Sequence, residues 1–285
     1  MDYWYKLSVL FLILLFFIEI VINQKEKKNL YKRKDTFQNI LIGGGLVLAL
    51  FLSRMFVIPC YYLTYSFRIC TIHNTWVTWI AAFVLTDLFY YVYHRSCHSI
   101  NWFWVAHSVH HSSEEFNISL SFRISWLVHI SGEFLFWVWL PIIGFDPLVI
   151  LICFQLCSLY QSWLHTELIK KLHPLFEWIF NTPSHHRVHH SSEVKYLDKN
   201  HGAVLIIWDR IFGTYQEEEN SKTTYGLTNK QVADDVSTII FSDWKTLFTK
   251  IQTAGSFING INYIIQPPGW SHDGSSLTVK KLRNI

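Results

Sequence analysis

Nine histidines of this 285-residue chain stand at spacings that suit metal binding. One cluster has the form His-x-x-x-His, two have the form His-x-x-His-His, and a single histidine lies between the second and third clusters. Residues three and four apart share a face of an α-helix, so each cluster is predicted to aim its imidazoles toward a common point. The nine are His94, His98, His107, His110, His111, His165, His186, His189 and His190.

The number of imidazoles indicates two metal ions. A single tetrahedral or octahedral ion cannot use nine nitrogen donors, whereas two neighbouring ions can share them at about four or five each. Neutral imidazole suits zinc, copper, iron and nickel, so the ligand type alone does not name the metal. Structural zinc sites are closed and commonly include sulfur, whereas a site made of histidines has room for open positions where dioxygen could bind. This favours iron and redox chemistry.

Other histidines and the cysteines are interpreted as structural residues. His185 adjoins the last cluster, but it lies about 100° around the helix from its neighbours and is a weaker ligand candidate. The five cysteines form no Cys-x-x-Cys pair, so neither a zinc ribbon nor a disulfide framework is indicated. Cys97 stands between two of the nine histidines and could be a ligand, but redox chemistry at the site would oxidise a thiolate there, so we interpret it as a small core residue. Four more histidines have no other histidine at ligand spacing and are interpreted as structural, namely His73, His129, His173 and His272.

Charged residues near the clusters either have a specific partner or are solvated surface charges. Asp87 lies in an otherwise apolar helix and therefore needs a partner. Arg187, inside the last cluster, either neutralises a carboxylate or contacts an anionic head group, and a plain surface arginine is an equal alternative. Carboxylates either orient the imidazole N–H groups or are solvated loop charges; the candidates are Asp87, Glu114, Glu115, Asp198 and Asp209.

The composition is that of an integral membrane protein. Apolar residues make up 51% of the chain and charged residues only 16%, against about 25% in soluble proteins. The net charge is +3, and basic residues concentrate between positions 25 and 34 instead of forming a broad face, so nucleic acid is an unlikely partner.

Five apolar runs approach the length of a membrane span of about 20 residues, namely 4–23, 39–59, 76–93, 125–143 and 147–167. The first run is predicted to be a retained helix because it lacks a basic n-region and a cleavage site. The loop QKEKKNLYKRKD carries six Lys or Arg and is assigned to the cytoplasm. If the chain changes sides at each later span, all nine histidines are predicted to lie on the cytoplasmic face.

These observations predict an all-α integral membrane protein with four to five transmembrane helices and a cytoplasmic helical cap that carries the two metals. An apolar cavity is expected to descend from the metals into the bilayer, so that substrate enters from lipid. The expected parts are N-terminal helices with the basic loop (1–74), a catalytic domain (75–215) and a polar cytoplasmic tail (216–285). Within the second part, the short apolar segment GAVLIIWDRIFGTY either packs under the metal site or lies at the interface.

The clusters and their surroundings resemble a known family. The runs DLFYYVYHRSCHSINWFWVAHSVHHSSEEFN, NTPSHHRVHH and DKNHGAVLIIWDRIFGTY are similar to the histidine boxes of the fatty acid hydroxylase and sterol desaturase superfamily. Within it, HHSSEEFN, QSWLHTE, TPSHHRVHH and PPGWS most resemble the alkylglycerol monooxygenase branch. Several boxes in a fixed order within a membrane context make a specific signature.

The resemblance implies a membrane-bound di-iron oxygenase that uses dioxygen to hydroxylate a lipid such as an alkylglycerol, a sterol or a fatty acyl chain. By motif, His94 and His98 match the first box, and His165 matches the histidine between the second and third boxes. Two positions depart from the pattern: Gln161 stands where some hydroxylases have a histidine, and His201 stands where a tyrosine is usual. The second box corresponds to His107, His110 and His111, and the last to His186, His189 and His190.

Electrons must come from outside, because the sequence holds no haem, flavin or nicotinamide motif; a reductase protein or a reduced pterin is the expected donor. Desaturation of a sterol or fatty acyl chain at the same site is the nearest alternative. A metal transporter is a rival of another class, although it predicts polar residues spread through several helices. An inactive lipid-binding relative is a third alternative. A bacterial inner membrane and an endoplasmic reticulum membrane fit equally.

Overall fold

The protein is built of helices. A computed structural model describes residues 2–219, 223–228 and 233–284, and within these ranges regular structure is α-helical or 3-10 helical. The described chain contains no strand, and extended backbone pairs only in two isolated bridges, Phe180 with Leu205 and Ser191 with Tyr225. The all-α prediction is therefore confirmed for the described residues.

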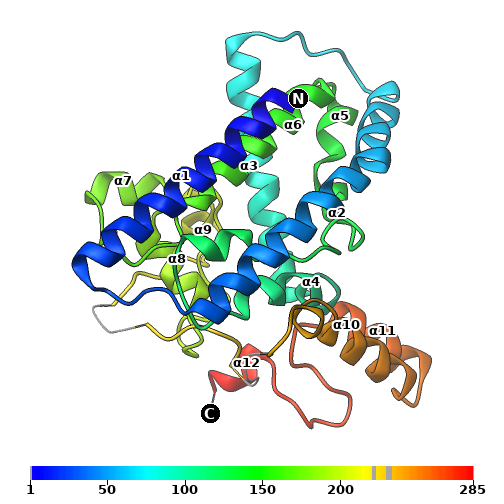
Figure 1. The fold of residues 1–285 in the computed structure, drawn as a ribbon. Coiled ribbons are helices and arrows are strands. Elements are labelled where there is room, and N and C mark those ends of the chain that lie inside the picture. The colour runs from blue at the N-terminus through cyan, green and yellow to red at the C-terminus, as the bar shows by residue number, and fades with distance from the viewer. Residues whose placement is uncertain (1, 220–222, 229–232, 285) are drawn as a thin grey trace.

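Three long helices have the length and composition to cross a membrane: α1 (Asp2–Glu26), α2 (Arg33–Ser66) and α3 (Trp76–Ser99). Their apolar windows have mean hydropathies of 1.9, 2.2 and 1.3. Large apolar side chains such as Leu48 and Phe51 are exposed on the outer surface of α2, as expected for contact with lipid. The chain is a membrane protein. Figure 1 shows α1 and α2 crossing one side of the molecule in opposite directions, joined by the basic loop.

The two later apolar runs differ from the continuous spans that the hydropathy predicts. Residues 126–132 form turns, followed by the 3-10 helix η2 (Glu133–Trp137) and the short helix α5 (Trp139–Ile143). Gly132 adopts a left-handed φ of 92°, and the Ser131 hydroxyl donates to the nearby carbonyl of Val128, so the local backbone is diverted from a helix. The 16-residue α6 (Pro147–Ser162) is also below span length. Among the described residues, three helices are long enough to cross, so the four to five spans expected from the sequence are not confirmed.

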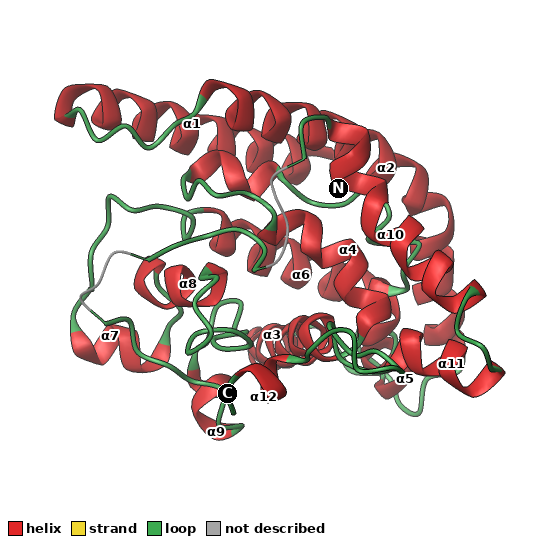
Figure 2. Ribbon diagram, turned by 90° about the horizontal axis from the view of Figure 1, so that it is seen from below, coloured by secondary structure: helices red, strands yellow, loops and turns green. Residues whose placement is uncertain are grey.

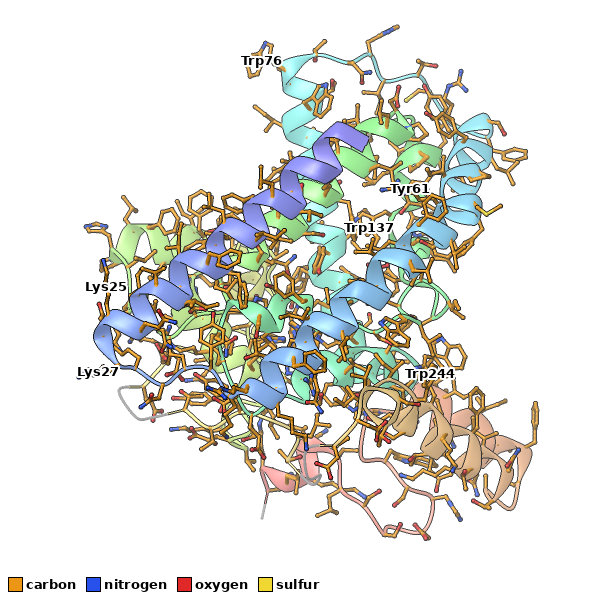
Figure 3. The ribbon with its side chains drawn as sticks, in the orientation of Figure 1. Lys25, Lys27, Tyr61, Trp76, Trp137 and Trp244 are labelled. Atoms are coloured by element: carbon orange, nitrogen blue, oxygen red, sulfur yellow. The ribbon has the colours of Figure 1, made fainter. Side chains whose placement is uncertain are left out.

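A core of aromatic and small side chains joins these segments beneath the histidines. Trp137 is 1% exposed, and its indole N–H donates to the carbonyl of Thr86 at 3.0 Å. The hydroxyl of Tyr61 on α2 donates to the carbonyl of Phe134. Figure 3 shows Tyr61 and Trp137 on the inner side of α2, toward α3. Cys97 lies in the same core, as its interpretation as a packing residue predicts.

The segment after the last cluster packs beneath the histidines, which is one of its two predicted placements. Ala203 and Ile206 are fully buried ahead of the short helix α9 (Ile207–Ile211). Asp87 of α3 accepts hydrogen bonds from the main-chain N–H of Val204 at 2.8 Å and from the indole of Trp208 at 2.8 Å. The apolar helix thus carries a buried carboxylate because it anchors this segment.

Parts of the expected C-terminal tail are helical. Residues beyond 232 form α10 (Val236–Gln252) and α11 (Phe257–Ile265), capped by the side chains of Asp235 and Ser256. The short helix α12 (Val279–Leu282) follows. Figures 1 and 2 both show α10 beside α4 (Asn101–His111), the helix that carries the second histidine cluster.

Candidate metal centre

Four separate elements deliver the nine histidines. The first pair lies at the end of α3, which starts with a capping box on Thr75 and ends at Ser99. After the extended Ile100 the chain starts again as α4 with the second cluster. The third cluster occupies α8 (Pro183–His190), whose Pro183 at the first position favours helix initiation. The lone histidine follows the end of α6.

The structure brings all nine histidines together in two adjacent groups, in each of which the ligand atoms lie within 4.8 Å of one another. Both His-x-x-His-His clusters are divided between the groups, so neither cluster aims at a single point as the helical spacing suggests. The i and i+4 members stay together, and the residue between them turns to the other group. The first group is His94, His98, His107, His111 and His189, and the second is His110, His165, His186 and His190.

Distances within the groups match nitrogens that share an ion. In the first, Nε2 of His107 lies 3.0 Å from Nε2 of His94 and 3.1 Å from that of His111. In the second, Nε2 of His165 lies 3.1 Å from that of His110 and 2.9 Å from that of His186. Two nitrogens bound at about 2.0–2.1 Å and at right angles around one ion would lie about 3 Å apart.

Several buried nitrogens also lack a protein partner, which is the second sign that the groups fit cations. Nε2 of His98, His189 and His190 has no hydrogen-bond partner among the described residues. Buried polar atoms are almost always paired, so unpaired ring nitrogens that face one another suit a metal ion. The residues present therefore fit two bound ions.

Burial keeps the imidazoles neutral, the form that binds metals. Desolvation by burial, followed by the charges of neighbouring imidazoles, lowers the pKa of His107, His111 and His189 well below the ordinary value. Burial lowers the pKa of His165 to about 4. The same causes lower the pKa values of His110, His186 and His190.

Main-chain carbonyls orient three of the rings. Nδ1 of His94 donates to the carbonyl of His201 at 2.8 Å, and Nδ1 of His189 donates to that of Lys199 at 2.9 Å. Nδ1 of His110 donates to the carbonyl of Arg123 at 3.2 Å. Because a carbonyl only accepts, each Nδ1 carries the proton and each Nε2 is left with a lone pair facing its group.

Asp209 holds the loop that supplies two of these carbonyls. Its carboxylate accepts hydrogen bonds from the main-chain N–H of His201 at 2.8 Å and of Gly202 at 2.7 Å, and from the hydroxyl of Thr214 at 2.6 Å. Asp209 therefore acts through backbone and does not touch an imidazole. Of the other candidate carboxylates, Asp198 lies 3.4 Å from Nδ1 of His98, and Glu115 pairs instead with Lys32, while Glu114 is exposed.

A buried ion pair that the sequence reading missed braces α4. Nε of Arg123 donates to the carbonyl of Val109 at 3.1 Å, and its guanidinium lies 3.3 Å from the carboxylate of Asp35 and 2.8 Å from the amide oxygen of Asn39. Arg123 is fully buried. The signal that could have found this network is the polar Asp35 and Asn39, one turn apart at the start of an apolar span.

Glu19 is a second missed residue. It lies in α1 and is 3% exposed, and it accepts hydrogen bonds from the N–H of Ile118 at 2.6 Å and from the hydroxyls of Tyr31 and Thr166. Thr166 directly follows His165. A lone acid in an apolar run is the sequence signal for such a contact.

The doubtful candidates occupy distinct environments outside the two groups. His185 turns its ring toward Tyr215, at 5.6 Å between centroids. His201 is buried with its ring centroid 5.0 Å from that of His98. The amide of Gln161 donates to the carbonyl of Cys157 within α6. Arg187 pairs with Glu218 at 2.6 Å, which supports the carboxylate-neutralising reading.

The remaining histidines have structural partners. Nδ1 of His129 lies 2.6 Å from the carboxylate of Glu133, and the side chain of His173 caps α7 (Pro174–Ile179). His272 is bound to the hydroxyl of Tyr263 at 2.7 Å. The carbonyl of His73 accepts a hydrogen bond from Thr78 at the start of α3.

Comparison with known proteins identifies the class of this site. Residues 79–214 match the fatty acid hydroxylase family model, and this stretch contains all nine histidines. This match confirms the resemblance read from the boxes. No solved structure matches the chain.

Individual proteins within this class are also similar to the chain. The chain is 36% identical to the alkylglycerol monooxygenase of Homo sapiens over 269 residues, which is 93% of this chain and 59% of the relative. It is 39% identical to that of Danio rerio over 68% of this chain and 43% of the relative. The ornithine lipid hydroxylase OlsE of Rhizobium tropici is 28% identical over 53% of this chain and 46% of that protein. The chain spans between 40% and 60% of the length of the alkylglycerol monooxygenases it matches.

Proposed function

We propose that the chain is a membrane-bound di-iron oxygenase that hydroxylates a lipid. The observation that carries this proposal is the pair of adjacent groups of five and four histidines inside the protein. Histidine-only sites favour iron over structural zinc, and the similar proteins named above are monooxygenases and a hydroxylase of lipids. Residues 75–215 would carry the catalytic site.

In this proposal the first group holds one iron and the second group holds the other. When bound, the two ions would supply the activation of dioxygen. With two electrons from a reductase protein or a reduced pterin and two protons, one oxygen atom would enter a C–H bond of the lipid and the other would leave as water. The lipid is an alkylglycerol, a sterol or a fatty acyl chain, and hydroxylation of an alkylglycerol ether carbon would lead to cleavage. The chain itself needs no nucleophile.

The protein's own side chains exclude water from this chemistry. The ring of Phe116 packs 5.4 Å from that of His190 and stacks on Tyr225 at 4.8 Å, which covers the second group. The indole of Trp104 lies 5.3 Å from the ring of His98 and covers the first. An apolar groove of about 400 Å³ lies between α1 and α6, and no histidine of the centre lines it. The cavity expected below the metals remains a prediction.

We place the metal groups on the cytoplasmic side of a multi-pass protein. The basic loop between α1 and α2 supports this, because it contacts the chain just after the second cluster: Lys32 pairs with Glu115 at 2.5 Å, and the amide of Asn117 donates to the carbonyl of Leu30. Figure 3 shows Lys25 and Lys27 at the end of α1 that leads into this loop. Positively charged loops favour the cytoplasm.

Metal analysis with matched variants of α8 tests the proposal. The purified protein is expected to hold about two irons per chain. His189→Ala should lose iron and lipid hydroxylation, whereas His185→Ala, four residues earlier and outside both groups, should keep them. Zinc that survives His189→Ala would overturn the oxygenase reading and favour a structural or transport role. An unsaturated product from a sterol or acyl substrate would favour the desaturase alternative.

A further inference from the structure

Helix α11 carries an unpartnered apolar face. Phe257 is 84% exposed, Ile258 70% and Ile265 52%, and Ile261 is exposed between them. These four positions are spaced by one, three and four residues, so they lie along one side of the helix. They define what we call the α11 apolar face. α11 itself, with the sequence FINGINYII, contains no charged residue.

This face is what remains after the hairpin of α10 and α11 has packed. Trp244 of α10 inserts beside Trp102 of α4, with ring centroids 5.0 Å apart, and the hydroxyl of Ser108 donates to Asp243 at 2.7 Å. From α11, the carbonyl of Tyr263 accepts a hydrogen bond from the side chain of Asn101. The opposite side of α11 is therefore already engaged with α4. Figure 3 shows Trp244 where α10 meets the body of the protein.

The hairpin begins at the level where α2 begins. The amide of Gln38 donates to the carbonyls of Ala233 at 3.2 Å and Asp234 at 3.1 Å, and Lys34 pairs with the carboxylate of Asp234. Arg33 and Lys34 open the most apolar span of the chain, which places this level at the lipid head groups. The start of α10 is thus bonded to the first turns of α2, next to this candidate span.

An apolar surface continues from α2 onto the hairpin. The indole of Trp126 donates to the carbonyl of Ile42 of α2 at 2.8 Å, and its ring lies 6.2 Å from that of Phe241 on α10. Phe241 is 42% exposed and Phe248, two turns on, is 50% exposed. Lys245 and Gln252 border these rings on the same side of α10, whereas the exposed, polar Thr246 lies about 140° around the helix from Phe241. One side of the hairpin thus suits lipid and another suits water.

We propose that α10 and α11 form an interfacial anchor whose α11 apolar face, with Phe241 and Phe248, enters the leaflet at which α2 begins. The α11 apolar face would then contact the lipid at the boundary between head groups and acyl chains. With nine residues, α11 is too short to span and long enough to lie in the interface. Because the hairpin is bonded to α4, the anchor holds the second histidine cluster at the membrane surface. The proposal depends on membrane location and not on the oxygenase reaction.

Fluorescence in lipid nanodiscs tests this placement. In a Cys60→Ser, Cys70→Ser background, an environment-sensitive label is attached at Ile258→Cys or, as the matched control, at the exposed Thr246→Cys. The other cysteines are buried. In phosphatidylcholine nanodiscs, the label at 258 should emit at shorter wavelength and be quenched by nitroxide-bearing lipids but not by iodide. The label at 246 should show the reverse.

Each contrary outcome has a distinct meaning. Iodide quenching at 258 without nitroxide quenching would show a face in water, as a docking site for another protein requires, and would overturn the proposal. A blue-shifted label that no lipid nitroxide reaches would point to contact between two copies of the chain. As a second variant, Phe257→Ser with Ile258→Ser should lower nitroxide quenching of a label at Ile265→Cys severalfold while iron content is unchanged. Both replaced side chains are exposed, so folding is preserved.

Discussion

His94 and His201 are joined by a hydrogen bond in which the ring Nδ1–H of His94 donates to the main-chain carbonyl of His201 at 2.8 Å. The bond fixes the tautomer of His94 and leaves Nε2 to the first group. The carbonyl is held in place because Asp209 accepts from the N–H of Gly202, which belongs to the same peptide group. A carboxylate outside both groups thus orients a candidate ligand through one peptide unit.

Asp209→Asn should therefore weaken metal binding without removing any candidate ligand. The amide keeps the shape of the side chain, but it has one acceptor oxygen for the two N–H groups of His201 and Gly202. We expect a loss of roughly 10- to 100-fold in affinity for the first metal, measured by metal titration of the purified protein. Glu217→Gln, which removes an exposed acid paired with Lys171, is the control. Equal effects of the two variants would show that Asp209 has no positioning role.

The unequal size of the two groups predicts unequal tolerance to substitution. His190→Ala leaves three histidines in the second group, whereas His111→Ala leaves four in the first. The rings of these two residues stack at 4.4 Å, so both variants open space at the same boundary. His190→Ala should lose about one iron per chain, and His111→Ala should lose less, by elemental analysis. The opposite order would mean that the groups do not act as separate sites.

The metal-free protein should lose stability as the pH falls through the range of the buried imidazoles. Burial lowers the pKa of His165 from 6.5 to about 4, so below pH 6.5 the unfolded chain binds a proton that the folded chain does not. The stabilisation is complete above about pH 6.5 and is lost progressively toward about pH 4, at about 3 kcal/mol for this one residue. Thermal unfolding of chelator-treated protein across this range checks it, and a pH-independent midpoint would contradict it.

The ion pair between Arg123 and Asp35 should be essential for stability. Arg123→Ala removes the guanidinium and leaves the Asp35 carboxylate buried without its charge partner, which costs about 3–5 kcal/mol. Adding Asp35→Asn to that variant should recover part of the loss because no buried charge remains. Unfolding in detergent measures both, with Arg68→Ala at an exposed position as the control. If the double variant were no more stable than Arg123→Ala, the electrostatic explanation would fail.

The nine histidines that the structure brings together could all be named from the sequence. The spacing of His107, His110 and His111 is a local property of a helix, and imidazoles at such spacing in an apolar chain indicate metal chemistry beside a membrane. Helix content and the three longest spans are local as well, because they follow from continuous apolar runs. The resemblance to the hydroxylase family rests on the same contiguous motifs.

The division of the histidines into groups of five and four was decided only by the tertiary structure. Helical period places His186, His189 and His190 near one another, but which group each ring joins depends on how α8 meets α3 and α4. Likewise His94 is oriented by a carbonyl 107 residues further along the chain. Gly132 and the turns around it break a run that hydropathy alone reads as continuous. Periodicity and hydropathy report on neighbours in sequence, whereas ligand geometry and buried partners arise from contacts between segments far apart in it.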